Sequence, residues 1–182
     1  MTDFLERLLI GRSGRQTISK YAQGIDRYLG VMTIISAALL GGSLSSPIGF
    51  SENFLGLQGQ IAIFPSLLTL FKNGMGGPAV LGAVVFGVLP ILSISTAFEI
   101  WYKHPLQGDK FGKYARRITI FNGLWLLLAA ALVGLIYMLN TSEQGRLYMP
   151  IYYLLVSVMM QKIILMRLKR MVALVQFVDD DR

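Results

Sequence analysis

Four long stretches without a charged side chain divide this chain, and each is rich in apolar residues. A bilayer core takes about 20 apolar residues per helix. Three of the stretches reach that length, and the fourth reaches it once Lys162 is included. The pattern predicts an all-α membrane protein whose four transmembrane helices cover residues 28–45, 78–98, 118–139 and 149–166.

The remaining segments divide around this four-helix domain, which we place at residues 28–170. In residues 1–27, apolar side chains at helical spacing predict a cytoplasmic amphipathic segment. This segment carries Asp3 and Glu6 and has no continuous apolar core, so the first transmembrane helix is expected to act as the insertion signal. Residues 171–182 are predicted to form a cytoplasmic tail.

The connection between the first two helices is expected to be a small outer subdomain. In residues 46–64, Leu57 and Ile61 alternate with polar residues, which predicts a two-stranded element. After Pro65, the apolar side chains share one helical face, which predicts a short helix resting on the membrane. The apolar run there is too short to cross the bilayer.

Composition agrees with a membrane protein, and charge orients it. Hydrophobic residues make up 54% of the chain, charged residues only 15%, and the mean hydropathy is +0.57. If each helix crosses once, all 17 Lys and Arg residues except Lys72 and Arg146 fall on one side. Such a bias places both termini in the cytoplasm. We therefore expect a multi-pass protein of the bacterial inner (cytoplasmic) membrane.

Small residues recur every fourth position along the first two predicted helices. The first helix carries Thr33, Ala37, Gly41 and Ser45, and the second carries Ala79, Ala83 and Gly87. Small side chains at this spacing let two helix backbones approach closely in lipid. We interpret both stripes as packing seams within the chain. The alternative is that one of them faces another subunit.

The second predicted helix has two further features. Pro90 removes one backbone hydrogen bond and is expected to kink the helix. Glu99 and Lys103 lie four residues apart at its end, in the order that favours an ion pair on one helix face. This pair is a possible polar site near the lipid headgroups.

Basic residues cluster beside the ends of the third and fourth helices. The net charge of +7 would suggest nucleic-acid binding in a soluble protein, but here the cations flank membrane helices. Anionic headgroups attract each such cation by about 1 kcal/mol. The expected partners are membrane lipids and not nucleic acid, and the expected headgroup contacts are Arg116, Arg117, Arg167, Lys169 and Arg170.

The sequence offers little for catalysis. It has no cysteine, so disulfides and thiolate sites are excluded, and His104 is its one histidine. Glu99 and Glu143 fall at opposite membrane edges, which leaves Lys162 as the nearest candidate for an intramembrane ionisable group. A lysine that close to a helix end can snorkel to water. We expect no catalytic residue, metal site or cofactor from this chain, and we expect bound lipids.

Two short phrases carry a family resemblance. The residues are Ser66, Leu67, Leu70, Phe71 and Gly74, followed by Leu89, Pro90, Ile91 and Leu92. With the order of elements over residues 29–170, they resemble one domain of the paraquat-inducible protein A family. Members of that family are polytopic inner-membrane proteins associated with lipid-transport systems of the bacterial envelope. The resemblance implies a first span, an outer segment of short strands and a second span with an apolar-proline motif.

Together these features favour a non-catalytic membrane subunit or scaffold of a larger assembly, with other membrane proteins as partners. The resemblance implies a component of envelope lipid transport. The alternative is an accessory structural subunit of a respiratory or photosynthetic complex. A small lipid transporter or lipid enzyme that uses Glu99 and Lys103 is a third hypothesis.

The charge distribution predicts the topology directly. A reporter fused after Asn140 should lie outside the cytoplasm, and one fused at Arg182 should lie inside it. Paired alkaline phosphatase and green fluorescent protein fusions measure this: phosphatase activity is expected at Asn140 and fluorescence at Arg182. The same side for both positions would contradict four crossings.

Overall fold

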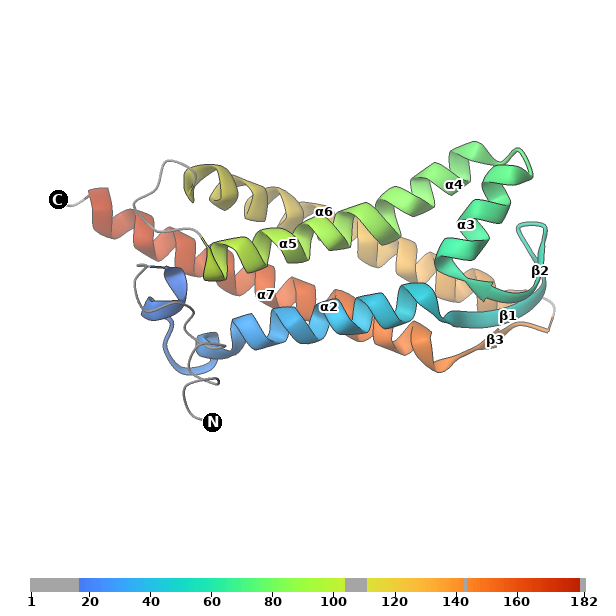
Figure 1. The fold of residues 1–182 in the computed structure, drawn as a ribbon, viewed down its shortest axis with the longest axis horizontal. Coiled ribbons are helices and arrows are strands. Elements are labelled where there is room, and N and C mark those ends of the chain that lie inside the picture. Colours follow the sequence, from blue (N-terminus) through green and yellow to red (C-terminus); the bar gives the residue numbers. More distant parts are fainter. Residues whose placement is uncertain (1–16, 104–110, 143, 181–182) are drawn as a thin grey trace.

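Four long helical stretches lie side by side in the computed structural model, which describes residues 17–103, 111–142 and 144–180, with side chains up to residue 174 (Figure 1). Within these residues, four stretches are long and apolar enough to cross a membrane: Gly24–Ser45, Gly76–Tyr102, Phe111–Thr141 and Met149–Leu174. This agrees with the predicted four-helix membrane protein. Which end faces the cytoplasm stays a prediction.

The helices correspond to the predicted spans but extend further at the basic end. The first span is α2, Leu29–Ser45, and the second comprises α4, Gly76–Ala83, a π-helical turn η3, Val84–Val88, and α5, Leu89–Tyr102. The third is α6, Phe111–Thr141, and the fourth is α7, Met149–Asp180. Lys, Arg, Met and Leu are good helix formers. The helix therefore continues into the basic segment after the apolar span has ended.

The segments outside the membrane domain are helical turns or helix where the structure describes them. Helix α7 continues into the predicted tail at residues 171–182 and ends at Asp180, and the cytoplasmic location of this tail stays a prediction. Before α2 the chain forms two short 3₁₀ turns, η1, Ile18–Tyr21, and η2, Gly24–Tyr28. Gly24 has φ +57°, a left-handed conformation that separates the two turns. The amphipathic helix predicted near the N-terminus lies outside the described residues.

A small sheet lies at the end of the bundle opposite the two termini (Figure 1). Strands β1, Pro47–Phe54, and β2, Leu57–Ala62, form an antiparallel hairpin. Leu55 and Gly56 connect them with φ of 52° and 78°, as a type I′ turn requires. The expected two-stranded element is therefore a hairpin. A third strand, β3, Arg146–Leu147, completes the order β2-β1-β3 and was not predicted.

Helix α3, Ile63–Lys72, follows β2 directly and has a buried face and an exposed apolar face. Ile63 and Leu70 are buried in the core. Phe64, Leu68 and Phe71 form an exposed apolar face. The short helix expected after Pro65 is thus present, beginning two residues earlier. That it rests on a membrane stays a prediction.

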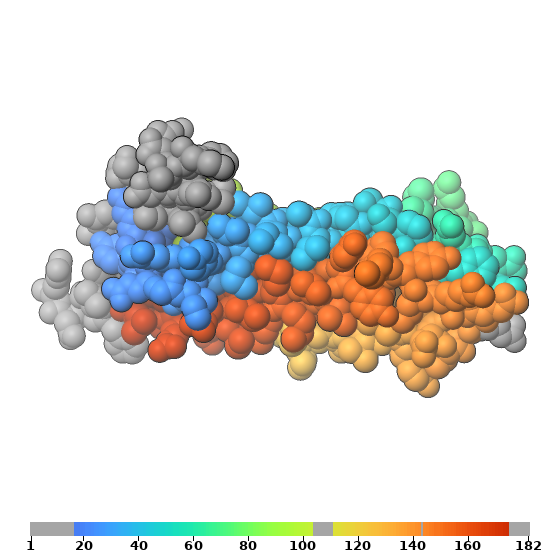
Figure 2. Space-filling view, turned by 90° about the horizontal axis from the view of Figure 1, so that it is seen from below, coloured from blue at the N-terminus to red at the C-terminus, as the bar shows by residue number. Residues whose placement is uncertain are grey.

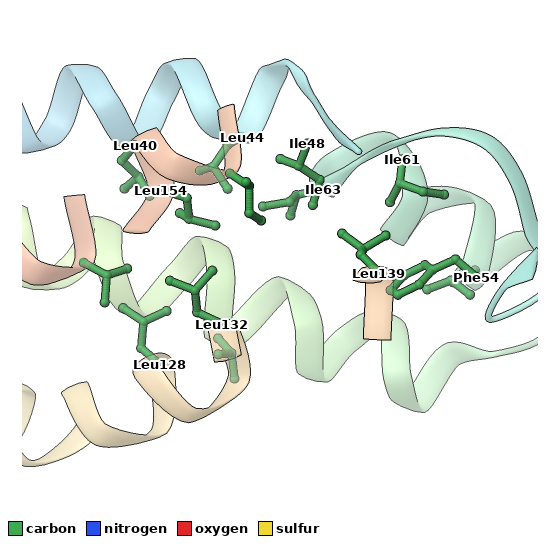
Figure 3. Packing of buried hydrophobic residues seen from close by; sticks show 14 of the residues in the cluster. Leu40, Leu44, Ile48, Phe54, Ile61, Ile63, Leu128, Leu132, Leu139 and Leu154 are labelled. Atoms are coloured by element: carbon green, nitrogen blue, oxygen red, sulfur yellow. The ribbon is translucent and has the colours of Figure 1, made fainter. Parts of the chain in front are cut away.

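The core consists of two apolar clusters, one at each end of the bundle. Near the sheet, side chains from α2, the sheet, α6 and α7 point toward one another, among them Leu44, Ile48, Leu132 and Leu154 (Figure 3). Near the termini, Trp101 lies at the centre of the second cluster and is 1% exposed. Because the sheet belongs to the first cluster, it is continuous with the membrane bundle.

A close approach between α2 and α5 depends on Gly30. A Cβ atom added there would lie 2.5 Å from Trp101 Nε1 and would also overlap the hydroxyl of Tyr102. Real Cβ atoms do not approach other heavy atoms so closely, so the buried ring of Trp101 and the Tyr102 side chain, or the helices themselves, would have to shift. Gly41, on the same helix, has no atom within 4 Å of its added Cβ.

This contrast gives a matched pair of variants. Gly30→Ala should destabilise the protein by about 1–3 kcal/mol, the usual cost of overpacking a well-packed core. Gly41→Ala should leave stability unchanged or raise it by up to about 1 kcal/mol, because alanine favours a helix over glycine. Thermal unfolding of both variants in one detergent measures the difference. Equal midpoints would contradict the close approach at Gly30.

Candidate functional site

The first and last helices are joined by two buried serines. Helices α2 and α7 lie side by side along the molecule (Figures 1 and 2). Ser157 Oγ donates to the backbone oxygen of Ser36 at 2.8 Å, and Ser36 Oγ lies 3.2 Å from the backbone oxygen of Ser157. Both residues are 0% exposed. Their small side chains permit close contact, and each hydroxyl reaches the partner's backbone.

The small-residue stripe of α2 faces mostly away from this contact. Thr33 is buried, but Ala37, Gly41 and Ser45 are exposed. The interpretation of the stripe as a seam within the chain is therefore wrong for these three residues. A four-residue step overshoots a helical turn by about 40°, so three steps rotate the stripe by about 120° away from the core. That the stripe faces another subunit stays a prediction.

The stripe of the second span lies within the protein. Ala79 and Gly87 are buried and Ala83 is half-buried. Their neighbour is α3, since a Cβ atom added at Gly87 would lie 3.5 Å from the ring of Phe64. At Gly87 this seam therefore joins the second span to the short helix of the sheet end.

Pro90 lies directly after an irregular turn. It is buried as the second residue of α5, and the π-helical turn Val84–Val88 precedes it. Proline cannot donate to the carbonyl one turn earlier and its ring collides with that carbonyl, so a wider turn accommodates it. The sequence predicted an irregularity of the helix at Pro90, but it did not predict that this would be a π-helical turn.

A small cavity lies between α5, α6 and α7, close to this turn. Its volume is about 10 Å³, room for about one water molecule. The buried polar side chains that line it are Ser93 and Gln161, and Gln161 Nε2 also donates to Ser157 Oγ at 3.3 Å. The polar group at Ser36 and Ser157 thus continues toward the middle of the bundle.

Lys162 is held inside the α6–α7 contact. Its Nζ donates to Asn122 Oδ1 at 3.0 Å and lies 5.0 Å from the centre of the Trp125 ring. The indole of Trp125 in turn donates to the backbone oxygen of Val158 at 2.7 Å. Lys162, which is half-buried, therefore has partners on the neighbouring helix. That its ammonium group also snorkels to water stays a prediction. Asn122 and Trp125 were missed as its partners because nothing in their spacing relates them to Lys162.

The predicted polar pair is present at the basic end. Lys103 Nζ lies 3.8 Å from Glu99 Oε1, and the lysine side chain is 65% exposed. An exposed pair of this spacing contributes about 0.3–0.5 kcal/mol, so it is a surface feature. His104 and Glu143 lie outside the described residues.

The expected headgroup contacts divide into two groups. Arg167 Nη1 lies 3.3 Å from Asp26 Oδ1, so this arginine joins α7 to the turn before α2. Its partner within the chain was not predicted, because the two residues are 141 positions apart. The other four, Arg116, Arg117, Lys169 and Arg170, are exposed, and that they contact lipid headgroups stays a prediction.

The polar side chains described above, within the described part of the chain, connect neighbouring helices to one another. The described ranges contain no group of three His, Cys, Asp or Glu side chains that could hold a metal. No protein-family model matches the chain, and comparisons with curated proteins and with solved structures gave no match. The resemblance to the paraquat-inducible protein A family therefore stays an expectation.

The serine contact predicts a measurable coupling between α2 and α7. The two hydroxyls also lie 3.1 Å apart, so the side chains interact directly. Ser36→Ala and Ser157→Ala should each lower stability, and a double-mutant cycle should give about 0.6 kcal/mol of interaction, the average for hydrogen bonds between membrane helices, and at most about 1.7 kcal/mol. Ser45→Ala is the control, because its hydroxyl donates to Gly41 on its own helix at 2.9 Å. Unfolding in detergent measures the cycle, and purely additive effects would contradict the contact.

Proposed function

We propose that this protein is a non-catalytic integral membrane subunit that binds another membrane helix through the outer face of α2. The observation that carries the proposal is the exposure of Ala37, Gly41 and Ser45 on that face. The assembly we propose is an envelope lipid-transport system of the paraquat-inducible protein A type. That choice rests on the phrases around Phe71 and Pro90 that resemble the family.

The outer face of α2 has the shape that helix association in lipid requires. Ala38 and Gly42 are exposed beside the stripe, and added Cβ atoms at Gly41 and Gly42 meet no atom within 4 Å. Lipid chains supply no hydrophobic drive between helices, so association depends on close backbone packing. Because Ser45 donates to Gly41 within the helix, its hydroxyl is satisfied, and the sheet-side half of this face, from Ala37 to Ser45, presents small side chains beyond the exposed Ile34 and Ile35.

Charge supports the proposed location in a bacterial inner membrane with both termini in the cytoplasm. The end of the bundle with both termini carries the exposed cations Arg116, Arg117, Lys169 and Arg170, whereas the sheet end carries Lys72 and Arg146 (Figure 1). Cations beside helix ends are attracted to the anionic lipids of the cytoplasmic leaflet.

The proposal predicts that Gly41→Leu removes a partner without unfolding the protein. A leucine on this face would hold the partner's backbone away, while the added atoms meet nothing within the chain. Purification from native membranes in mild detergent, with quantitative mass spectrometry, measures how much of each stoichiometric partner remains. We expect at least a tenfold loss with an unchanged thermal midpoint.

Gly123→Leu is the matched control. Gly123 is an exposed glycine of α6 with equally open space, and Leu127 follows it one turn later. This variant should keep every partner. Full retention of partners by Gly41→Leu, or equal loss from both variants, would contradict the α2 docking face.

A further inference from the structure

A cleft of about 270 Å³ lies between β2 and α3 at the sheet end of the bundle. The residues that line it come from one strand and one helix. They are Gly56, Leu57, Gln58, Gln60 and Ile61 from the strand and the turn before it, and Pro65, Ser66, Thr69 and Asn73 from the helix and its C-terminal end.

The cleft runs along the edge of β2. Successive side chains of a strand point to opposite faces of its sheet. Gln58 and Gln60 are exposed, Leu57 and Ile61 are buried, and all four line the cleft. A cleft bounded by both faces of a strand lies beside its edge, where backbone donors and acceptors point outward. In the described sheet, β2 has β1 as its one neighbour.

Helix α3 turns its polar face to the cleft. Pro65, Thr69 and Asn73 recur every four residues on that face. The exposed apolar residues Phe64 and Phe71 lie nearly opposite this face, by the 100° helical step, and Leu68 lies about 100° from its centre. A helix that lies on a membrane through its apolar face would therefore open the cleft to water.

The free edge of β2 has neither a charged side chain nor a proline to protect it. Exposed edges are blunted by charged side chains, proline, short length, bulges or a covering helix. Gly59, with φ +95°, makes the middle of β2 irregular, and α3 forms the far wall of the cleft without filling the space beside the edge. The opposite edge strand, β3, has two residues and includes Arg146. In contrast, β2 has six residues, Leu57–Ala62, and no charged residue lines the cleft. The carboxamides of Gln58 and Gln60 make no side-chain hydrogen bond within the described part of the protein.

We propose that this cleft binds an extended, uncharged peptide segment of a partner protein, which adds to the sheet as a fourth strand beside β2. Backbone hydrogen bonds to the strand edge would supply the affinity, and alternate side chains of the peptide would contact the lining of the cleft. Because the cleft is open along a strand edge, an extended chain can lie in it and pair its backbone with the strand.

The proposal goes beyond the α2 docking face and does not depend on it. Gly41 lies on the membrane helix, whereas the cleft lies between the hairpin and α3. Peptide binding would therefore be tested on the purified full chain, where a failure of the α2 proposal changes nothing.

The experiment is a screen of blocked, uncharged octapeptides against the full chain held in detergent micelles, followed by titration of the best binder. Backbone recognition is then tested by N-methylating the peptide at alternate positions, which removes amide donors from one edge only. We expect one set of alternate N-methyl groups to weaken binding at least tenfold, and the other set to change it less than threefold. A neighbouring strand hydrogen-bonds to only one edge of an extended peptide. Only the N-methyl groups on that edge should therefore weaken binding.

Two variants of α3 place the binding site. Thr69→Trp should fill the cleft and weaken binding at least tenfold, because Thr69 lines it. Leu68→Trp is the control on the neighbouring exposed face and should bind normally. Thermal midpoints equal to that of the unmodified protein show that both variants are folded. If a variant does not fold, the comparison of N-methylated peptides still tests the proposal, because it uses the unmodified protein.

Three results would overturn the proposal. The first is that no octapeptide binds with a Kd below about 1 mM, which corresponds to a binding free energy of about −4 kcal/mol. The second is that both N-methylated sets bind alike. The third is that uncharged oligosaccharides bind in a manner that Thr69→Trp abolishes while no peptide does, which would assign the cleft to a sugar.

Discussion

The contact of α2 with α7 through Ser36 and Ser157 is the interaction on which the remaining structure depends. It joins the first membrane helix to the last, and both serines are fully buried. The same pairing continues beyond the helices: β1 follows α2, β3 precedes α7, and the two strands pair antiparallel. Closing the bundle at this seam places α5 and α6 on the other side and sets the sheet at one end.

Polar side chains within the bundle obey the constraint that a solvent of lipid imposes. A polar group there needs a partner inside the protein. Lys162 has Asn122 and Trp125, and Gln161 donates to Ser157. Lys162 joins α7 to α6, and Ser157, to which Gln161 donates within α7, joins α7 to α2, so the last helix organises the bundle.

The two proposed contact surfaces suit two different solvents. From Ala37 to Ser45 the outer face of α2 carries small residues, with open space beside Gly41 and Gly42, which suits close helix packing in lipid. The cleft beside β2 is lined by amides, hydroxyls and a strand edge, which suit recognition of a peptide in water. A membrane subunit with both surfaces could hold one partner within the bilayer and a second beyond it.

The sequence by itself determined the four spans, the hairpin region and the short helix after it, because helix length and hydrophobic periodicity are local properties. It also placed Glu99 and Lys103 together, since the helix brings residues four apart into contact. Only the tertiary structure decided which face of each helix is inside. The α2 stripe turned outward because its step of four differs from the helical period, and Ser36 took the seam. Residues far apart in sequence, such as Asp26 and Arg167, carry no local sign of their pairing, so packing of the whole chain was needed to reveal it.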